Sequence, residues 1–320
     1  MSRAKGLLAT VALLAAFALH LTPAAADDLV KVAIGQRGNW DTAVPQLGEM
    51  AGIFKKHGIA LELLYTSGGG ETQQAVLSGS VDVGTAAGTM GVLSAFSKGA
   101  PVRIIGAEAT GAADYWYAQT SSGIKNLKDT DGKTIAYSTN GSSTHSIVLA
   151  FIKEFGLTAK PTATGNPSAT LTAVMSGQVD VGWAAPPFGL KELSEGKTQI
   201  VARANDAKIV AGQTIRVVLT NVDTLQNRKD VVKRFMQAYR ETIDYMYSND
   251  QALKDYAEFA RIPEATARRV RDEFFPKALI WPDQFKGADS LLAEAVTLKY
   301  IAKPLTKDQM AELIQIDAVK

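Results

Sequence analysis

A stretch of twenty residues occurs twice in this chain. Thr72–Gly91 reads TQQAVLSGSVDVGTAAGTMG, and Thr170–Gly189 reads TLTAVMSGQVDVGWAAPPFG. The copies are offset by 98 residues and share 12 of 20 positions, whereas chance gives roughly one identity in such a window. Solenoid repeats span only about 20–50 residues, so this offset corresponds to a domain. The sequence predicts two similar lobes whose loops after the Val-Asp-Val-Gly strands form the walls of one cleft. The alternative is a common strand–loop pattern used twice without functional meaning.

The rest of the chain alternates between strand and helix patterns, which is typical of a mainly parallel α/β sheet covered on both faces. In the first half we expect strands at Lys31–Ile34, Leu61–Tyr65, Val81–Gly84 and Val102–Gly106, and helices at Val44–His57 and Glu71–Ser78. In the second half we expect strands at Thr134–Tyr137, Val179–Gly182 and Gln199–Ala202, and helices at Ser142–Phe155 and Ala169–Ser176. Ligands of such sheets bind beyond the carboxyl ends of the strands.

Two extended segments flank the second half and are predicted to cross between the lobes as hinge strands. They are Asp114–Thr120 and Ile215–Thr220. The predicted division assigns residues 27–117 and 219–320 to the first lobe and 118–218 to the second. The tail from Asn227 has helical periodicity and is expected to pack back on the first lobe.

The first 26 residues read as an export signal. Arg3 and Lys5 form a basic start, Leu7–Leu19 is an apolar run, and Ala24-Ala25-Ala26 is a small-residue cleavage site. The apolar run is too short to span a bilayer comfortably, although a membrane anchor is the alternative. We expect cleavage after Ala26 and a soluble periplasmic protein. The chain has no cysteine, so a lipid anchor on an N-terminal cysteine is excluded.

Composition excludes several functional classes. The lack of cysteine rules out disulfides and thiolate chemistry. Loss of the signal would leave 32 basic and 32 acidic residues. The chain would then have no excess of positive charge with which to attract nucleic acid. His57 and His145 would be the remaining histidines, too few for a histidine zinc cluster, and no G-x-S-x-G motif occurs. We expect no cofactor, no metal and no catalysis, with scattered carboxylates as the alternative route to an enzyme.

A hydroxyl-rich loop leads from a predicted strand into a predicted helix. It reads Ser138-Thr139-Asn140-Gly141-Ser142-Ser143-Thr144-His145. Backbone N–H groups at a helix start lack intrahelical partners, and together with the helix dipole they favour an anion. Ser142 or Ser143 can cap the helix while a second hydroxyl remains free. The loop therefore predicts ligand contact, with simple capping as the alternative.

Two tryptophans lie at predicted strand ends. Trp40 follows Gly38-Asn39, and Trp183 stands in the second repeat where the first copy has Thr85. An indole can wall a pocket and donate one hydrogen bond, so both are predicted cleft residues, with core packing as the alternative for Trp183. Arg37 and Arg216 are the nearest cations, and each is interpreted as a surface charge rather than an anion clamp.

The chain resembles periplasmic substrate-binding proteins of ABC importers. The resemblance is to the branch for nitrate, taurine, aliphatic sulfonates and thiamine-pyrimidine precursors, known as NMT1/THI5-like. The motifs that carry it cover most of residues 30–190: Gly52-Ile53-Phe54-Lys55-Lys56-His57-Gly58-Ile59 before Leu61–Tyr65, Leu77-Ser78-Gly79-Ser80-Val81-Asp82-Val83-Gly84, Leu127-Lys128-Asp129 through Gly132-Lys133-Thr134-Ile135-Ala136, and Gly141-Ser142-Ser143-Thr144-His145.

This resemblance implies a two-lobed, hinged fold of type II that holds a ligand between the lobes. Carried over onto this sequence, the ligand-contacting positions are Asn39, Trp40, Gly68, Gly69, Ala87, Thr89, Asn140, Ser142, Ser143, Thr144, Trp183 and Pro186. Asp82 and Asp180 are expected to serve structure through bonds to nearby backbone. Pro186-Pro187 replaces Gly88-Thr89 in the second copy and removes two backbone donors, so this wall should be apolar.

The expected function is a monomeric solute-binding component that captures a small organic anion and delivers it to an ABC permease with its ATPase. An apolar wall argues against a small hydrated anion such as nitrate. A neutral heterocycle stacked between the tryptophans, an enzyme on the same fold, and a ligand-sensing partner of a membrane receptor remain as alternatives.

Overall fold

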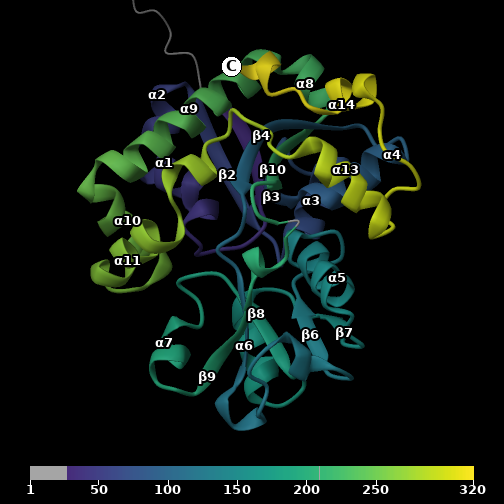
Figure 1. Cartoon of the computed structure of the whole chain (residues 1–320). Helices are drawn as coiled ribbons and strands as arrows, with labels where there is room; N and C mark the ends of the chain where they lie inside the picture. Colours follow the sequence, from purple (N-terminus) through teal and green to yellow (C-terminus); the bar gives the residue numbers. More distant parts are fainter. Residues whose placement is uncertain (1–26, 209) are drawn as a thin grey trace, which may run out of the picture.

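The computed structural model describes residues 27–208 and 210–320, and the predicted signal sequence lies outside them. The molecule has two lobes, each built on a five-stranded sheet (Figure 1). The first sheet has the strand order β2 (Ile59–Tyr65), β1 (Asp28–Ile34), β3 (Val83–Gly88), β10 (Thr214–Asn221) and β4 (Val102–Thr110). The second sheet has the order β7 (Lys160–Ala163), β6 (Thr134–Tyr137), β8 (Val181–Ala184), β5 (Tyr115–Gln119) and β9 (Thr198–Arg203).

The two sheets follow one plan. In each, the first three strands in the order are parallel, as the sequence alternation predicts. The fourth strand, β10 or β5, runs antiparallel to both of its neighbours. The carboxyl ends of the parallel strands in each lobe lead into the loops that meet between the lobes.

The predicted hinge strands do not cross between the lobes. The segment predicted at Asp114–Thr120 forms β5, which pairs only with strands of the second sheet. The segment predicted at Ile215–Thr220 forms β10, which lies inside the first sheet. The chain instead passes from the first sheet to the second between Thr110 and Tyr115, leaves the second sheet after Arg203, and is back in the first sheet from Thr214. Extended pattern alone marks a strand but does not identify the sheet to which it belongs.

Helices cover both faces of each sheet. On one face of the first sheet α1 (Val44–Met50), α2 (Ile53–Lys56) and α9 (Lys229–Ser248) bury a core that includes Val32, Leu47 and Phe235. The other face carries α3 (Gly69–Leu77), α4 (Thr89–Ser97) and α13 (Ala288–Thr297). In the second lobe α5 (Ser143–Phe155) covers one face, and α6 (Pro167–Met175) and α7 (Leu190–Ser194) cover the other.

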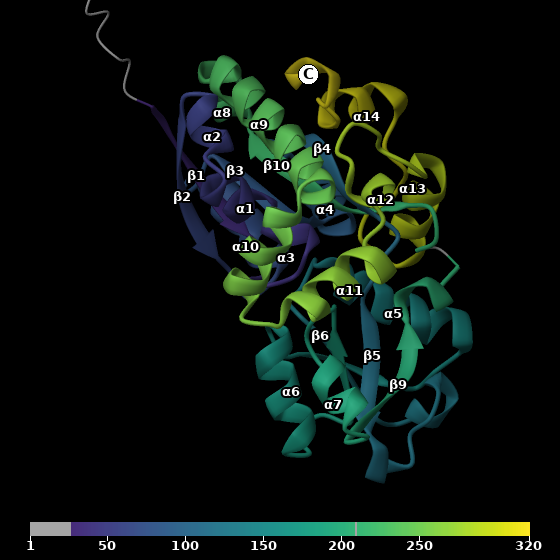
Figure 2. The ribbon, with the colours of Figure 1, turned by 90° about the vertical axis from the view of Figure 1, so that its left-hand side faces the viewer.

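The helical tail packs on the first lobe, as predicted. Figure 2 shows the lobes one above the other, with the tail helices on the upper lobe. The remaining elements are α8 (Val222–Asn227), α10 (Asp250–Ala260), α11 (Glu264–Phe274), α12 (Lys277–Ile280), α14 (Lys307–Leu313) and the 3-10 turns η1 (Asp41–Ala43), η2 (Thr120–Ser122), η3 (Leu127–Thr130), η4 (Ala204–Asp206) and η5 (Asp317–Val319). None of the helices in the described part of the chain has the length and apolar character needed to cross a bilayer.

The sequence repeat is also a repeat of hydrogen bonds. The hydroxyls of Thr66 and Thr72 lie 2.8 Å apart in the first lobe. In the second lobe the hydroxyls of Thr164 and Thr170, each 98 residues further on, lie 2.6 Å apart. Each pair ties a strand end to the helix that follows it, so the two copies are structurally equivalent units.

The repeated aspartates have the structural role predicted for them. Asp82 accepts from the N–H of Lys31 at 2.8 Å and from Arg228 Nη1 at 2.6 Å. Asp180 accepts from the N–H of Thr134 at 2.9 Å and from its hydroxyl at 2.7 Å. In each lobe this carboxylate ties the repeat strand to the strand beside it.

Three local predictions were inaccurate. The helix predicted over Val44–His57 is two helices, because Gly52 adopts a left-handed φ of 70° between them. The strand β3 continues to Gly88 beyond the predicted end at Gly84. The edge strand β7 was missed because it contains Pro161, and a proline is tolerated only at an edge position such as this one.

Candidate functional site

The helix starts of α3 and α5 meet where the two lobes touch. We call this contact the seam: residues 68–70, 88 and 91 of the first lobe against residues 138–143 of the second. The N–H of Gly70 donates to Thr139 Oγ1 across it at 3.1 Å. α3 follows β2 and α5 follows β6, so each of these helix starts lies at the carboxyl end of a parallel strand.

Glycines make this close approach possible. A Cβ on Gly68 would lie 2.8 Å from the hydroxyl oxygens of Ser138 and Thr139. One on Gly88 would lie 2.6 Å from the N of Ser143. None of these distances leaves room for a methyl group. Gly68 and Gly88 therefore serve contact between the lobes rather than backbone flexibility.

The α5 start combines a helix cap with free donors, as predicted. Ser142 is the N-cap, and its hydroxyl accepts from the N–H of His145 at 3.2 Å. The Thr144 hydroxyl is held by Ser138, 2.9 Å away. Among the described residues, the Ser143 hydroxyl and the N–H groups of Ser143 and Thr144 have no partner. Ser143 and Thr144 are both buried, so these three donors lie inside the structure without a protein partner.

The loop that follows β1 is buried more deeply in the first lobe than the sequence suggests. Trp40 is fully buried, packs edge-on against Tyr256 and donates its indole N–H to Tyr247 at 3.0 Å. Asn39 is also fully buried, with its Oδ1 unpaired. The loop touches the second lobe where a Cβ on Gly38 would lie 3.0 Å from Phe188. The indole of Trp40 is thus a core group of the first lobe.

The second repeat loop is buried as well. Trp183 lies opposite Trp116 in the sheet and is fully buried in the second core. Its indole N–H has no partner, whereas that of Trp116 donates to the Ala136 carbonyl at 2.9 Å. Pro186 is buried at the end of this loop. Ligand contact by Trp40, Trp183 and Pro186 therefore stays a prediction.

Arg216 is not a surface charge, and that interpretation was wrong. It is 4% exposed and lies between two fully buried carboxylates. Its Nη2 donates to Asp41 at 2.7 Å and its Nη1 to Asp114 at 3.1 Å. Asp41 follows β1, and Asp114 ends the first passage between the sheets. Arg37, by contrast, is exposed and lies over the ring of Phe259 at 4.5 Å.

Glu108 adds a third carboxyl to this cluster. It is 1% exposed, accepts from the N–H of Ala86 through Oε2, and leaves Oε1 unpaired. Ala86 has a left-handed φ of 60°, a strained conformation for alanine. Burial, together with the negative charge of Asp41, raises the pKa of Glu108 to about 8. The carboxyl is therefore mostly protonated at neutral pH and can donate a hydrogen bond.

Glu108 should make the protein less stable as pH rises from about 4.5 to about 8. The folded protein keeps this proton while the unfolded chain releases it, so unfolding becomes easier by at most about 1.4 kcal/mol per pH unit. Glu108→Gln should remove this contribution, and its stability relative to wild type should be higher at pH 7.5 than at pH 5.5. Urea unfolding at both values, with exposed Glu62→Gln as control, tests this. An equal difference at both pH values would contradict it.

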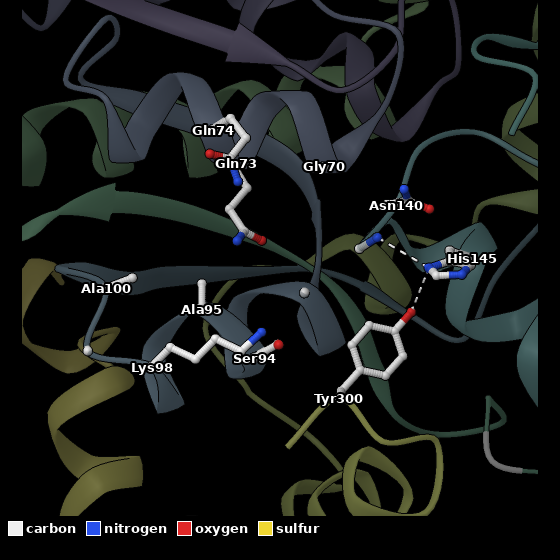
Figure 3. Close-up of a pocket in the computed structure, with 13 residues that line it drawn as sticks. Gly70, Gln73, Gln74, Ser94, Ala95, Lys98, Ala100, Asn140, His145 and Tyr300 are labelled. Carbon is white, nitrogen blue, oxygen red and sulfur yellow. Dashed lines mark hydrogen bonds between the residues drawn. The ribbon is translucent and has the colours of Figure 1, made fainter. Parts of the chain in front are cut away.

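A hollow of about 620 Å³ opens beside the seam. Figure 3 shows its walls: α3 with Gln73, α4 with Ser94 and Lys98, the loop with Asn140, and Tyr300 from the tail. His145 lines it from α5, and its Nδ1 lies 3.0 Å from Tyr300 Oη. The hollow is thus bounded by both lobes.

The seam brings together five of the predicted site residues: Gly68, Gly69, Asn140, Ser142 and Ser143. Ala87 lies beside Gly69 within the first lobe, and the Thr144 hydroxyl contacts Ser138 and Ser142 within the second. Thr89 lies at the start of α4 and donates to the Thr214 carbonyl at 2.7 Å. Sequence reasoning missed Gln73, Glu108 and Tyr300. Glu108 could have been noticed as a lone acid in the apolar run Val102–Thr110, but nothing in the sequence brings Tyr300 to His145.

Two α/β lobes joined by two passages and closed on strand-end loops define the fold class of the periplasmic binding proteins. Residues 46–252 match the family described as NMT1/THI5 like, and the chain belongs to this family. No curated protein matches the sequence.

Solved structures with this fold include several binding proteins. The alkanesulfonate-binding protein SsuA from Xanthomonas axonopodis pv. citri, bound to MOPS, is 19% identical with a TM-score of 0.74, covering 91% of this chain and 99% of that one. SsuA from Escherichia coli is 18% identical with a TM-score of 0.67, covering 92% and 99%. The nitrate-binding protein NrtA from Synechocystis PCC 6803 is 13% identical with a TM-score of 0.71, covering 91% and 86%. At these identities the likeness concerns the fold.

Proposed function

We propose that this chain is the solute-binding component of an ABC import system. It captures a small organic anion between its lobes, closes around it, and delivers it to a membrane permease and its ATPase. The observation that carries the proposal is the seam, where the starts of α3 and α5 meet from opposite lobes and the α5 start keeps unpaired backbone donors. A site split between two lobes binds by closure, and no covalent step is required.

The choice of an anion rests on the α5 start. The N–H groups of Ser143 and Thr144 and the Ser143 hydroxyl lack partners in the described structure. Free N–H groups and the helix dipole together favour negative charge. Similar folds described as sulfonate-binding and nitrate-binding proteins support this class of ligand.

A neutral heterocycle is the second candidate. The Trp183 indole N–H is buried without a partner, and a ring nitrogen of a ligand could accept from it. A protonated Glu108 would likewise donate to a neutral acceptor. If the ligand is a neutral heterocycle, affinity should depend on the chemistry of its ring and should be little higher for a charged ligand.

Calorimetry with butanesulfonate and its uncharged sulfonamide separates the two candidates. We expect the sulfonate to bind more tightly, and Ser143→Ala to weaken it roughly ten- to a hundredfold because a hydrogen bond to a charged group is lost. Ser176→Ala, at the exposed end of α6, is the control and should change nothing. Equal affinity for both compounds with no effect of Ser143→Ala would reject the anion assignment and favour the heterocycle.

Export is part of the proposal. The apolar start and the Ala24-Ala25-Ala26 motif support a mature chain that begins at Asp27 and works in the periplasm. N-terminal sequencing of protein from the periplasmic fraction should find Asp27. Full-length protein recovered in membranes would instead favour an anchor.

A further inference from the structure

A side-chain hydrogen bond joins the two lobes at the edge of the hollow. The Tyr300 hydroxyl lies 3.0 Å from His145 Nδ1 (Figure 3). Tyr300 follows α13 and packs against the first-lobe core, whereas His145 lies in the first turn of α5 in the second lobe. The bond therefore exists only while the lobes are in contact.

A strained turn holds Tyr300 in place on the first lobe. Lys299 has a left-handed φ of 60°, which is unfavourable for a residue with a side chain. The turn returns the N–H of Tyr300 to the Ala295 carbonyl at 2.8 Å, and the next residue, Ile301, is buried in the first-lobe core. The backbone of Tyr300 is thus fixed independently of the second lobe.

His145 is fixed from its own lobe. Its ring stacks on Tyr137 at a centroid distance of 4.3 Å, and its Nδ1 accepts from the N–H of Gly141 at 3.3 Å. A backbone N–H can only donate, so Nδ1 carries no proton and accepts from the Tyr300 hydroxyl as well. Burial raises the pKa of Tyr300, so this hydroxyl keeps the proton that it donates.

The same nitrogen is connected to the seam. The carbonyl oxygen of Gly141 lies against the first lobe, where a Cβ on Gly88 would be 2.5 Å from it and a Cβ on Gly91 would overlap it. His145 Nδ1 therefore holds the loop that touches the first lobe, through Gly141, and also holds Tyr300 directly. Both contacts depend on an unprotonated Nδ1.

Protonation of the ring would break this arrangement. A proton on Nδ1 would face the N–H of Gly141, and although a hydroxyl can turn round, a backbone N–H cannot. The titratable groups around the ring are Tyr137 of β6, Tyr300 of the tail and Lys98 of α4, which lines the same hollow. The α3 residues that line it are uncharged, and no carboxylate lines it to stabilise an imidazolium. Burial lowers the pKa of His145, in agreement with a neutral ring.

We propose that Tyr300 and His145 form a latch that holds the lobes closed at neutral pH and releases them in mild acid. The proposal rests on closure of the lobes, which is part of the proposed function. Once the lobes part, the ring faces water and its pKa returns to the ordinary value of about 6.5. Below this pH the open form takes up more protons than the closed form, so acid favours opening. Glu108, with a pKa of about 8, stays protonated between pH 5 and pH 7 and does not contribute.

Solution scattering from the ligand-free protein tests the latch. Tyr300→Phe removes only the hydroxyl and should give a larger radius of gyration than wild type at pH 7. The radius of wild type should increase between pH 7 and pH 5. His145→Asn places an amide oxygen near the position of Nδ1 but does not titrate, so it should remove this pH dependence.

Two matched variants serve as controls. Tyr245→Phe also removes a tyrosine hydroxyl, but one that donates to Asp255 within the first lobe. His57→Asn changes the other histidine of the described chain, which lies 2.8 Å from Glu241 within the first lobe. Both variants should have the radius of wild type at pH 7 and the same increase at pH 5.

Calorimetry with butanesulfonate measures the latch in the presence of ligand. Tyr300→Phe should weaken binding at pH 7 roughly two- to tenfold, the effect of one lost hydrogen bond between neutral groups. The affinity of wild type should fall about threefold or more between pH 7 and pH 5, because the ligand must then displace a proton. The affinity of His145→Asn should change by less than about twofold over the same range, because Asn does not titrate there.

The latch and the proposed function fail in different ways. Equal radii of ligand-free wild type and Tyr300→Phe at both pH values would overturn the latch, even if butanesulfonate binds. A pH dependence that persists in His145→Asn would also overturn it. Absence of butanesulfonate binding together with the expected differences in radius would reject the anion class of the proposed function and support the latch.

Discussion

Gly70→Ala should weaken butanesulfonate binding about a hundredfold while leaving the protein folded. Gly70 lies in α3, and a Cβ there would overlap the Asn140 carbonyl oxygen of the other lobe. Overpacking of this kind costs about 3 kcal/mol at its upper range, equivalent to roughly a hundredfold in affinity. The penalty applies only to the closed form, because separation of the lobes removes the overlap. Calorimetry gives the affinity, and solution scattering gives the radius of gyration.

Two measurements exclude a folding defect. Alanine is a better helix former than glycine, so the unliganded variant should be as stable as wild type or more stable by up to about 1 kcal/mol. At a ligand concentration about ten times the dissociation constant of wild type, the radius of gyration should fall for wild type and for Lys254→Ala, at an exposed position of α10, but not for Gly70→Ala. Equal compaction of the variant and wild type would show that the seam does not limit closure.

Arg216→Met should lower the free energy of unfolding by about 3–5 kcal/mol at pH 7, the usual cost of leaving a buried charge uncompensated. The variant keeps Asp41 and Asp114 in the interior without a counter-charge. Protonation relieves such carboxylates, so the loss should be smaller at pH 5. Urea unfolding at both pH values measures the effect.

The exposed pair of Arg268 with Asp250 provides the control. Its atoms are 3.4 Å apart and both side chains are more than half exposed, so Arg268→Met should cost less than about 1 kcal/mol. Combining Arg216→Met with Asp41→Asn and Asp114→Asn should recover part of the stability. A loss below about 1 kcal/mol in Arg216→Met would show that this cluster is not stabilised by its charges.

Local sequence signals predicted most of the fold because each acts over a few residues. Thr134–Tyr137 is a strand as predicted, Ser142 caps α5 and Gly156 ends it in a left-handed conformation. The sheet assignment of β5 and β10 could not be predicted in this way. It depends on pairing between strands about a hundred residues apart, which hydrophobic pattern does not encode.

The site was predictable only where it follows the repeat and the helix start. The free Ser143 hydroxyl was anticipated because a cap needs only one of two adjacent serines. The burial of Trp40 was not, because it depends on Tyr247 and Tyr256 of the tail, far away in sequence. The buried pairing of Arg216 likewise requires three distant segments to meet.

The position of β10 has a consequence for how the chain acquires its structure during synthesis. β10 lies between β3 and β4 in the first sheet, yet it is made after every strand of the second sheet. The second lobe is formed by one uninterrupted stretch of chain, so it can fold while the first lobe is still incomplete. Until residues 214–221 emerge, β3 and β4 each expose an unpaired edge, the feature that makes unfinished sheets prone to aggregate. A chain that stopped before residue 214 would therefore contain a complete second lobe, inserted in a first lobe whose sheet lacks the strand between β3 and β4.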